Sequence, residues 1–405
     1  MPLPSVSKAF SAVFLASSVF RAVTVLGADS IQPPTIPITV HEWGTFTSVA
    51  GNQGESVSWA PLAATSDLPC FVHRLGKGIV KFTPGLVRME TPVVYFYAPA
   101  PTTASIRVDF PQGWITEWYP KATRVFPDNP GPYGTNAKGG AMYKPENGSI
   151  DWTDLKVSPG TNPQLPTTNG PSRYFAARAA ESAPVQSGDE DEKLLFYRGI
   201  ANFKVPVEAA LKGDVVAIRN TGPVPISLAV LFENQHGRVR FRVANDVKDT
   251  AIFNGADSTT GVEGVRGEMT RALERAGLYP KEAAAMVETW RDSWFEKGMR
   301  VFYLVPRATV DELLPLKVSP APRELRRVFV GRVEMLSPWR EQEIRTAMRT
   351  GDTHTLLTYG RFLSPFLEQM REKSPLDESP AVSAWVKDLE GKLFSQPAAS
   401  ASCVQ

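Results

Sequence analysis

The chain has 405 residues, of which 42% are hydrophobic and 21% are charged. This is the composition of an ordinary globular protein, with enough apolar side chains for one large core or two smaller ones. The formal net charge of +2 provides no general attraction to nucleic acid or to an anionic membrane surface, and argues against both as partners.

The first 28 residues have the pattern of a secretory signal peptide. Lys8 precedes an apolar run over residues 9–26 that Arg21 interrupts, and the small residues Gly27 and Ala28 follow. The uninterrupted part of this run is shorter than the roughly 20 apolar residues that cross a bilayer. We therefore predict an exported protein, periplasmic or extracellular, with no membrane span in the mature chain. An uncleaved N-terminal anchor is the alternative.

Residues 29–157 form a first β-rich region in the prediction. Alternating or β-branched runs, such as residues 87–91 and 106–110, are separated by prolines, as is typical of short or edge strands. Residues 158–192 are rich in proline, serine and threonine, and they are predicted to be a linker or a long loop.

Residues 193–336 form a second predicted β-rich region, with a helical insertion at 263–298. The turn signal Asn220-Thr221-Gly222-Pro223 lies between two strand-like runs and predicts a hairpin. In the insertion, Met286, Trp290 and Trp294 recur at helical spacing on one face, which indicates a core stripe.

The C-terminal part is predicted to be helical over residues 337–394, beginning at Ser337-Pro338, and to end in a disordered tail at 395–405. The sequence as a whole predicts a β-rich α+β fold, with antiparallel sandwich-like sheets and helices added in the C-terminal half. Cys70 and Cys403 could form a disulfide in an oxidising compartment, but a tail is a poor partner, and no disulfide framework is expected.

Several motifs resemble the recurring motifs of a group of uncharacterised exported bacterial proteins. They are His41–Ser48, Phe71–His73, Arg88–Val93, Thr116–Pro120, Phe196–Gly199, Trp290–Phe295 and Arg327–Glu334. The resemblance covers most of the mature chain. It implies export, and it carries over no activity.

The motif that opens the mature chain contains His41 and Glu42 as its titratable pair. A His-Glu-x-x-His zinc-protease motif is excluded, because Thr45 stands where the second histidine would be. Neighbouring residues on a strand point to opposite faces, so these two side chains could serve one site only if the chain turned near Gly44.

A metal site is a minority possibility. The chain has four histidines, which excludes a histidine-rich centre. The remaining candidates are His41, His73 and Asp67, with help from Cys70 or Glu90, and zinc needs three or four such ligands. No glycine-rich nucleotide-binding loop is present in the sequence, and no other cofactor is predicted.

Paired carboxylates are a second kind of catalytic candidate. Glu42, Glu90 and Glu117 lie beside aromatic residues in β-rich sequence, and His41 completes this candidate catalytic set. Two carboxyl groups roughly 5–10 Å apart can hydrolyse a glycosidic bond. The alternative is that Glu90 pairs with an arginine, while Glu42 and Glu117 bind backbone or lie in solvent.

Binding is the second class of function, because aromatic rings exposed on a sheet can stack on sugar rings. The candidate binding residues are Trp43, Trp118, Tyr119 and Arg198, and the alternative is that the rings fill the core. We expect an extracytoplasmic binding or structural protein, whose partner is a polysaccharide or another envelope protein. The alternative is a hydrolase of a polysaccharide or peptide, which would need a cleft where histidines and carboxylates converge.

Overall fold

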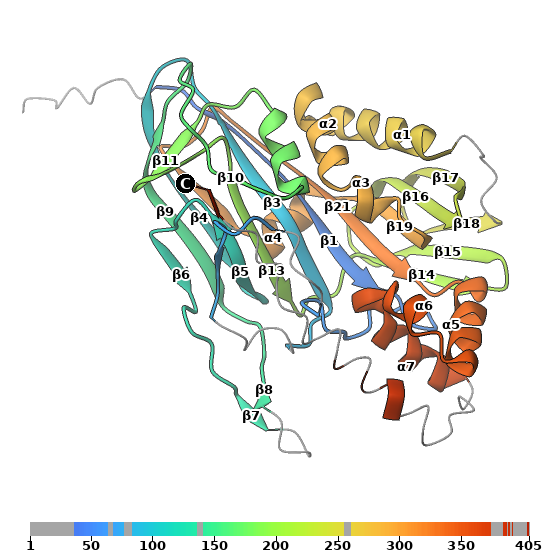
Figure 1. Cartoon of the computed structure of the whole chain (residues 1–405). Helices are drawn as coiled ribbons and strands as arrows, with labels where there is room; N and C mark the ends of the chain where they lie inside the picture. Colours follow the sequence, from blue (N-terminus) through green and yellow to red (C-terminus); the bar gives the residue numbers. More distant parts are fainter. Residues whose placement is uncertain are drawn as a thin grey trace, which may run out of the picture. The chain divides into compact units, whose positions relative to one another are not determined.

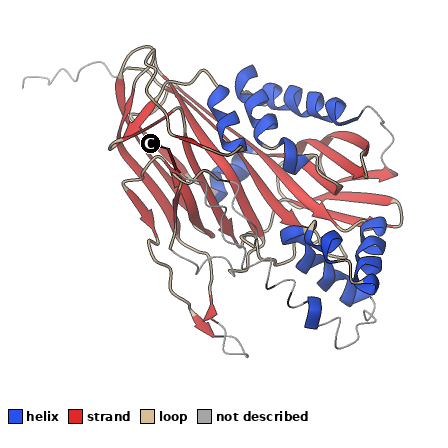
Figure 2. Cartoon of the chain, in the orientation of Figure 1, coloured by secondary structure: helices blue, strands red, loops and turns tan. Residues whose placement is uncertain are grey.

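A mixed nine-stranded sheet runs through the protein (Figures 1 and 2). Its strands, in spatial order, are β17 (Arg238–Val247), β16 (Ile226–Gln235), β19 (Gly298–Val305), β21 (Glu324–Met335), β1 (Thr39–Val49), β3 (Val87–Tyr97), β13 (Leu195–Ala201), β5 (Gly113–Tyr119) and β2 (His73–Arg74). Strands β1 and β21 pair in parallel, and the other neighbouring strands pair antiparallel. The computed structural model describes residues 36–63, 68–76, 83–135, 141–254, 261–373, 384–386, 388, 391 and 403–404.

The two predicted β-rich regions share this sheet. Strands β1, β2, β3 and β5 come from the first region and the remaining five come from the second, so neither region has a sheet of its own. Residues from Ile36 onward form one compact unit. The fold is α+β, with more strand than helix and with helices concentrated in residues 261–373, which confirms the predicted fold class.

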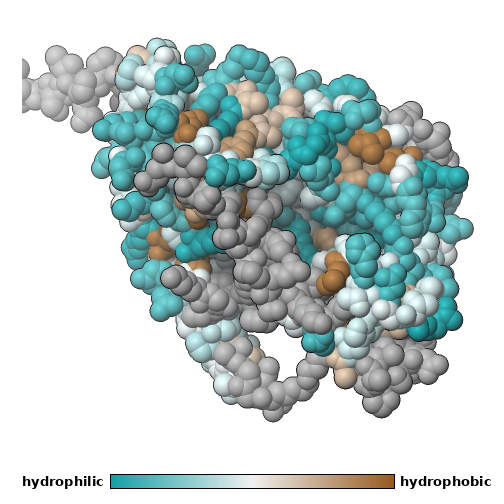
Figure 3. All heavy atoms as spheres, viewed as in Figure 1, coloured by the Kyte–Doolittle hydropathy of each residue, from teal (hydrophilic) through white to brown (hydrophobic). Residues whose placement is uncertain are grey.

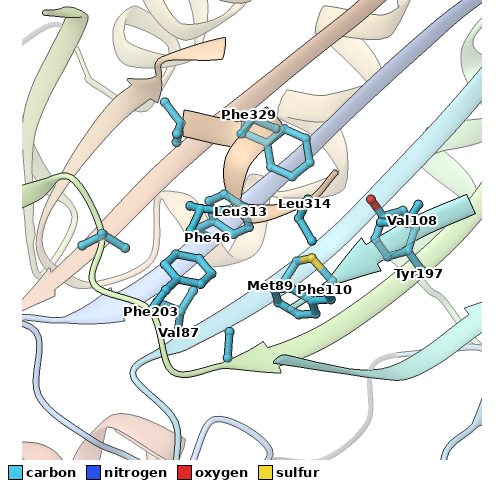
Figure 4. Close-up of a cluster of buried hydrophobic side chains, with 14 of the residues drawn as sticks. Phe46, Val87, Met89, Val108, Phe110, Tyr197, Phe203, Leu313, Leu314 and Phe329 are labelled. Atoms are coloured by element: carbon cyan, nitrogen blue, oxygen red, sulfur yellow. The ribbon is translucent and has the colours of Figure 1, made fainter. Parts of the chain in front are cut away.

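Two smaller sheets pack against one face of the nine-stranded sheet. The first contains β12 (Glu190–Glu192), β11 (Val185–Ser187), β9 (Gly148–Val157), β4 (Thr102–Phe110) and β20 (Leu316–Ser319), with β6 (Arg124–Phe126) paired to β9. The second contains β14 (Val207–Lys212), β15 (Val215–Asn220) and β18 (Thr250–Asn254). Both share a buried core with the large sheet and with α4 (Arg307–Leu313). In that core Phe46 of β1 stacks on Phe329 of β21, with ring centroids 5.0 Å apart (Figure 4).

Helices cover the opposite face of the nine-stranded sheet. They are α1 (Gly261–Arg275), α2 (Pro280–Thr289), α3 (Arg291–Trp294) and the short 3-10 helix η2 (Arg173–Ala179). Met286, Trp290 and Trp294 are buried in the core beneath them, so the predicted core stripe is confirmed. The predicted helix is interrupted at Trp290, where α2 ends and α3 begins.

A second group of helices packs where β1 and β21 end. It contains α5 (Pro338–Thr350), α6 (Thr353–Leu357), η3 (Gly360–Phe362) and α7 (Leu363–Lys373). Ser337 caps α5, because its Oγ accepts a hydrogen bond from the Arg340 backbone at 3.4 Å. Gly351 ends α5 at a φ of 69°, a left-handed conformation that favours glycine.

The segment predicted as a linker or a long loop, residues 158–192, lies within one compact unit and does not join two domains. It contains η2, which packs on α2, and strands β11 and β12, which extend the six-stranded sheet. Tyr174 and Ala177 of η2 are buried. The polar composition of this segment predicted no regular structure, but two buried side chains are enough to hold a short helix in place.

The predicted hairpin around Asn220-Thr221-Gly222-Pro223 is wrong. Strand β15 pairs with β14 and β18, whereas β16 pairs with β17 and β19. The turn is present, but it carries the chain from the three-stranded sheet to the nine-stranded sheet. A turn signal predicts a change of direction, and it does not say which strand will be the partner.

Within the predicted disordered tail, Cys403–Val404 form strand β22, which pairs with β10 (Thr167–Thr168). Cys70 is disulfide-bonded, and Cys403 is the only other cysteine in the sequence. The expectation that the tail is too poor a partner for a bridge therefore needs correction. The predicted signal peptide, residues 1–28, lies outside the described residues.

The surface is mostly hydrophilic in the face drawn in Figure 3, with separate apolar patches. Among the described residues, the large hydrophobic side chains that are exposed are Phe126, Tyr133, Val215, Ile252 and Tyr279. Tyr133 adjoins the small hairpin of β7 (Gly134–Thr135) and β8 (Ala141–Met142), which projects beyond the sheets in Figure 1. No helix in the described part of the chain has the length and apolar character needed to cross a membrane.

Candidate functional site

His41 and Glu42 contact opposite sides of the nine-stranded sheet, as expected for neighbours on a strand. Strand β1 continues from Thr39 to Val49 and pairs along both edges, so the chain does not turn at Gly44. A Cβ at position 44 would lie 2.7 Å from the Phe329 ring, which explains the glycine by close packing. The two residues therefore cannot share a site.

His41 lies beneath the N-terminus of α2, hydrogen-bonded to Glu282. Its Nδ1 is 2.9 Å from Glu282 Oε2, and both side chains are fully buried. The same carboxylate accepts hydrogen bonds from the Tyr97 hydroxyl and the Tyr279 backbone N–H, each at 2.7 Å. Because an ionised carboxylate can only accept hydrogen bonds, His41 donates to it from Nδ1.

The Nε2 atom of His41 is buried and has no hydrogen-bond partner among the described residues. The Tyr279 ring covers the imidazole, with centroids 4.5 Å apart. No hydroxyl or thiol of the described chain lies within hydrogen-bonding distance of Nε2, so the pair lacks the nucleophile of a catalytic triad. Glu282 is not among the predicted site residues, although Pro280 followed by an acid at the third helical position is a helix-start signal.

Glu42 is held in a buried ion pair on the other side of the sheet. Arg327 donates from Nε to Glu42 Oε2 at 2.5 Å, and the Tyr197 hydroxyl donates to Oε1. Arg327 also pairs with Asp311 of α4 at 2.8 Å. Glu42 and Arg327 are adjacent in the parallel register, so this pair joins β1 to β21.

Glu90 and Glu117 are also paired with arginines. Glu90 lies 2.7 Å from Arg361, and both oxygens of Glu117 accept hydrogen bonds from Arg88 at 3.2 Å. Burial alone would raise the pKa of each carboxyl, but the neighbouring guanidinium groups outweigh it and hold both pKa values below the ordinary range. A general acid needs a raised pKa, so neither carboxyl is suited to donate a proton near neutral pH. Glu90 was predicted to pair with an arginine, and it pairs with Arg361. Glu117 was predicted to bind backbone or lie in solvent, and it binds Arg88 instead.

A larger buried charge cluster, which the sequence did not reveal, surrounds Glu334. Its carboxylate accepts hydrogen bonds from Arg300 at 2.8 Å, Arg332 at 2.9 Å and Arg340 at 2.6 Å. These arginines hold the pKa of Glu334 well below its usual range, against the effect of burial. Arg300 also binds the backbone carbonyls of Trp294 and Glu296, so the cluster fastens the end of α3 to the sheet.

The predicted metal ligands do not assemble. His73 lies on the edge strand β2, separated from His41 of β1 by β3, β13 and β5, and its Nε2 is 2.9 Å from Glu190. Asp67 is outside the described residues. Cys70 is disulfide-bonded and is no thiolate ligand. In the described ranges no three histidine, cysteine or acidic side chains form a group that could hold a metal ion.

His73 belongs instead to a row of aromatic rings, which we name the aromatic surface. Its ring is nearly parallel to those of Trp118 and Tyr119, at interplanar angles of 23° and 19° and centroid distances of 6.0 and 6.1 Å. Tyr119 contacts Phe71 at 4.8 Å, and Phe71 contacts Phe175 of η2 at 6.3 Å. His73, Trp118, Phe71 and Phe175 are half-buried.

Polar groups border the aromatic surface and fix it in place. Glu190 binds His73 and also accepts from the Lys121 backbone N–H at 2.5 Å. Arg178 lies over the Phe175 ring, 4.8 Å from its centroid, and pairs with the buried Glu192 at 2.6 Å. Because strand pairing places His73 opposite Trp118, the two rings are set by backbone register rather than by a flexible loop.

Of the predicted site residues, His73, Trp118 and Tyr119 come together at one edge of the sheet. Trp43 is fully buried against Tyr95 in the core, and Arg198 is buried on the helix-covered face, where it donates to the Thr91 hydroxyl at 3.0 Å. No protein-family model matches the chain, and no curated protein sequence matches it.

Proposed function

We propose that the protein is exported and binds a polysaccharide at the aromatic surface. The observation that carries the proposal is a group of half-buried rings, Trp118, His73, Phe71 and Phe175, which the buried Tyr119 connects. A row of rings on a surface presents apolar faces at successive positions, and sugar rings of a linear chain have apolar faces that stack on them.

The polar border supports the same ligand class. Glu190 and Arg178 lie beside the rings and can hydrogen-bond sugar hydroxyls, with side-chain exposures of 23% and 14%. The buried rings Tyr119 and Tyr174 hold Phe71 from beneath, with Phe71 centroids 4.8 and 5.6 Å away. Little ordering is then required on binding, which favours affinity for a flexible sugar chain.

Export is supported by two features. One is the pattern of residues 1–28, with its basic start and short apolar segment. The other is the disulfide at Cys70, because structural disulfides form and persist in oxidising compartments such as the periplasm or the exterior.

Hydrolysis is less well supported than binding. The candidate acids are distributed over both sides of the sheet and are each paired with an arginine. Of the candidate set, His41 has an unpartnered nitrogen, but that atom is buried beneath Tyr279 with no reacting group beside it. An envelope protein is the other partner that the aromatic surface could accept.

Affinity electrophoresis tests the proposal. The intact protein is run in gels that contain carboxymethylcellulose, xylan, pectin or solubilised peptidoglycan, and we expect at least one of them to retard it. Trp118→Ala should then weaken binding about tenfold, which corresponds to about 1.4 kcal/mol. Tyr133→Ala is the matched control, because it removes an exposed aromatic ring on the projecting hairpin and should leave the retardation unchanged. Absence of retardation by every polysaccharide, or equal weakening by the two variants, would overturn the proposal.

A further inference from the structure

Glu190 places a carboxylate at the edge of the aromatic surface. It is the first residue of β12, and one of its oxygens is 2.9 Å from His73 Nε2. The side chain of Glu190 is 23% exposed and that of His73 is 33% exposed, so both reach solvent. The His73 ring in turn lies beside the half-buried Trp118 ring, with centroids 6.0 Å apart. A solvent-accessible carboxylate therefore adjoins two partly exposed rings.

The cations on the η2 side of the rings are already engaged. The Arg178 guanidinium lies 4.8 Å from the centroid of the Phe175 ring, but it pairs at 2.6 Å with Glu192, whose side chain is fully buried. The ammonium of Lys193 donates to the backbone carbonyls of Arg178 and Ala180. The Arg178–Glu192 pair is neutral as a whole, and Lys193 directs its charge at backbone oxygens.

Two further cations are close to the rings in the sequence or in space. Arg74 follows His73 on β2, and consecutive residues of a strand point to opposite faces. Lys121 donates to Glu190 through its backbone N–H, so its ammonium does not make that bond. The residue is exposed, and an exposed ammonium is well solvated and offsets a neighbouring charge only weakly.

The charges around Tyr119 are negative on balance. Burial raises the pKa of the Tyr119 hydroxyl above its ordinary value, and the carboxylates of Glu190 and Glu192 raise the pKa further. Arg178 acts in the opposite direction, and Asp191 again raises the pKa. Three acids thus act against one guanidinium at a ring that connects the aromatic surface, which favours a ligand with positive charge.

We propose that the aromatic surface binds a polysaccharide of amino sugars with free ammonium groups, such as a glucosamine polymer. This substrate class rests on the proposed polysaccharide binding. Sugar rings would stack on Trp118 and His73, and the Glu190 carboxylate would accept a hydrogen bond from an ammonium group. The ring faces attract a cation, and a hydrogen bond between an ammonium and a carboxylate is stronger than one between neutral groups.

The same chemistry disfavours other polysaccharides. An N-acetylated sugar keeps the apolar ring face but has no cation for Glu190, and a uronic acid places a second negative charge beside that carboxylate. The whole chain has a formal net charge of +2, which does not attract a cationic polymer. Preference for such a polymer must therefore come from a local group of acids and rings.

Isothermal titration calorimetry on the full chain tests the proposal, at a pH at which the amine of glucosamine is protonated. We expect a glucosamine oligomer to bind about tenfold more tightly than the N-acetylated oligomer of the same length. Glu190→Gln should remove most of this preference, because it removes the charge and keeps an acceptor for the Lys121 N–H. Asp189→Asn is the matched control, since it removes an exposed carboxylate from the turn just before β12 and should keep the preference.

Equal affinity of the unaltered protein for the two oligomers would overturn this substrate class, and that comparison needs no variant. If Trp118→Ala still weakened the binding of both, polysaccharide binding at the aromatic surface would stand. Equal loss of preference in Asp189→Asn and Glu190→Gln would also contradict the role of Glu190. An oligolysine peptide that binds as tightly as the glucosamine oligomer would do the same, because positive charge alone would then be sufficient.

Discussion

The imidazole of His41 and the carboxylate of Glu282 are hydrogen-bonded in the interior although 241 residues separate them in the sequence. The contact joins β1 to the first turn of α2, and the same carboxylate also binds Tyr97 of β3. Glu282 thus ties one helix to two neighbouring strands. Its bond to the Tyr279 backbone also caps the start of α2.

Removing the Glu282 carboxylate should destabilise the fold. Glu282→Ala leaves the donors of His41, Tyr97 and the Tyr279 backbone without their acceptor, and each unsatisfied buried group costs about 1–3 kcal/mol. We expect the free energy of unfolding, measured in urea, to fall by at least about 3 kcal/mol. The control is Glu181→Ala, which removes an exposed partner of Lys281 on the same helix and should have no measurable effect. Equal losses in the two variants would contradict this role.

A second prediction concerns the stability that the buried Glu334 carboxylate provides. Glu334→Gln removes the charge that three buried guanidinium groups share, and we expect a loss of about 3–5 kcal/mol in the free energy of unfolding. Glu263→Gln is the surface comparison, because its carboxylate is 80% exposed beside Arg266 and should change little. Adding Arg340→Met to Glu334→Gln should restore part of the loss, since one of the uncompensated charges is then gone. A double variant no more stable than Glu334→Gln would show that charge balance is not what the carboxylate supplies.

The pH dependence of stability follows from the lowered pKa values of Glu90, Glu117 and Glu334. Each group has a folded-state pKa below the ordinary value of 4.5, so the unfolded chain binds more protons on acidification. Their stabilising contribution is present above that value and is lost as pH falls through the folded-state pKa. Unfolding free energies measured from about pH 7 to about pH 3 should therefore decrease below about pH 4.5. Glu90→Gln should flatten this decrease, and an unchanged slope would argue against the ion pair with Arg361.

Local features could be predicted from the sequence where a short pattern determines the structure. The alternation of a strand separated His41 from Glu42, helical spacing placed Trp290 and Trp294 in the core, and Ser337-Pro338 marked a helix start. In each case the residues that make up the pattern are close together in the sequence.

Long-range features could not be predicted in this way. No pattern near His41 identifies Glu282, which is 241 positions away, and Arg300 of β19 is 34 positions from Glu334 in the sequence. The turn after Asn220 was recognised, but its strands joined different sheets. The aromatic surface was found in part, because Trp118 and Tyr119 are adjacent to each other, whereas Phe175 reaches them only through the packing of η2.

The parallel pairing of β1 with β21 has a consequence for how the chain acquires its fold. Thr39 is matched to Glu324 and Val49 to Glu334, so the second strand of the pair is synthesised after most of the chain. Until then one edge of β1 has no partner, and contacts of such high sequence separation form slowly. Nascent chains that stop before residue 324 therefore leave this edge of β1 unpaired, and an unpaired strand edge favours aggregation.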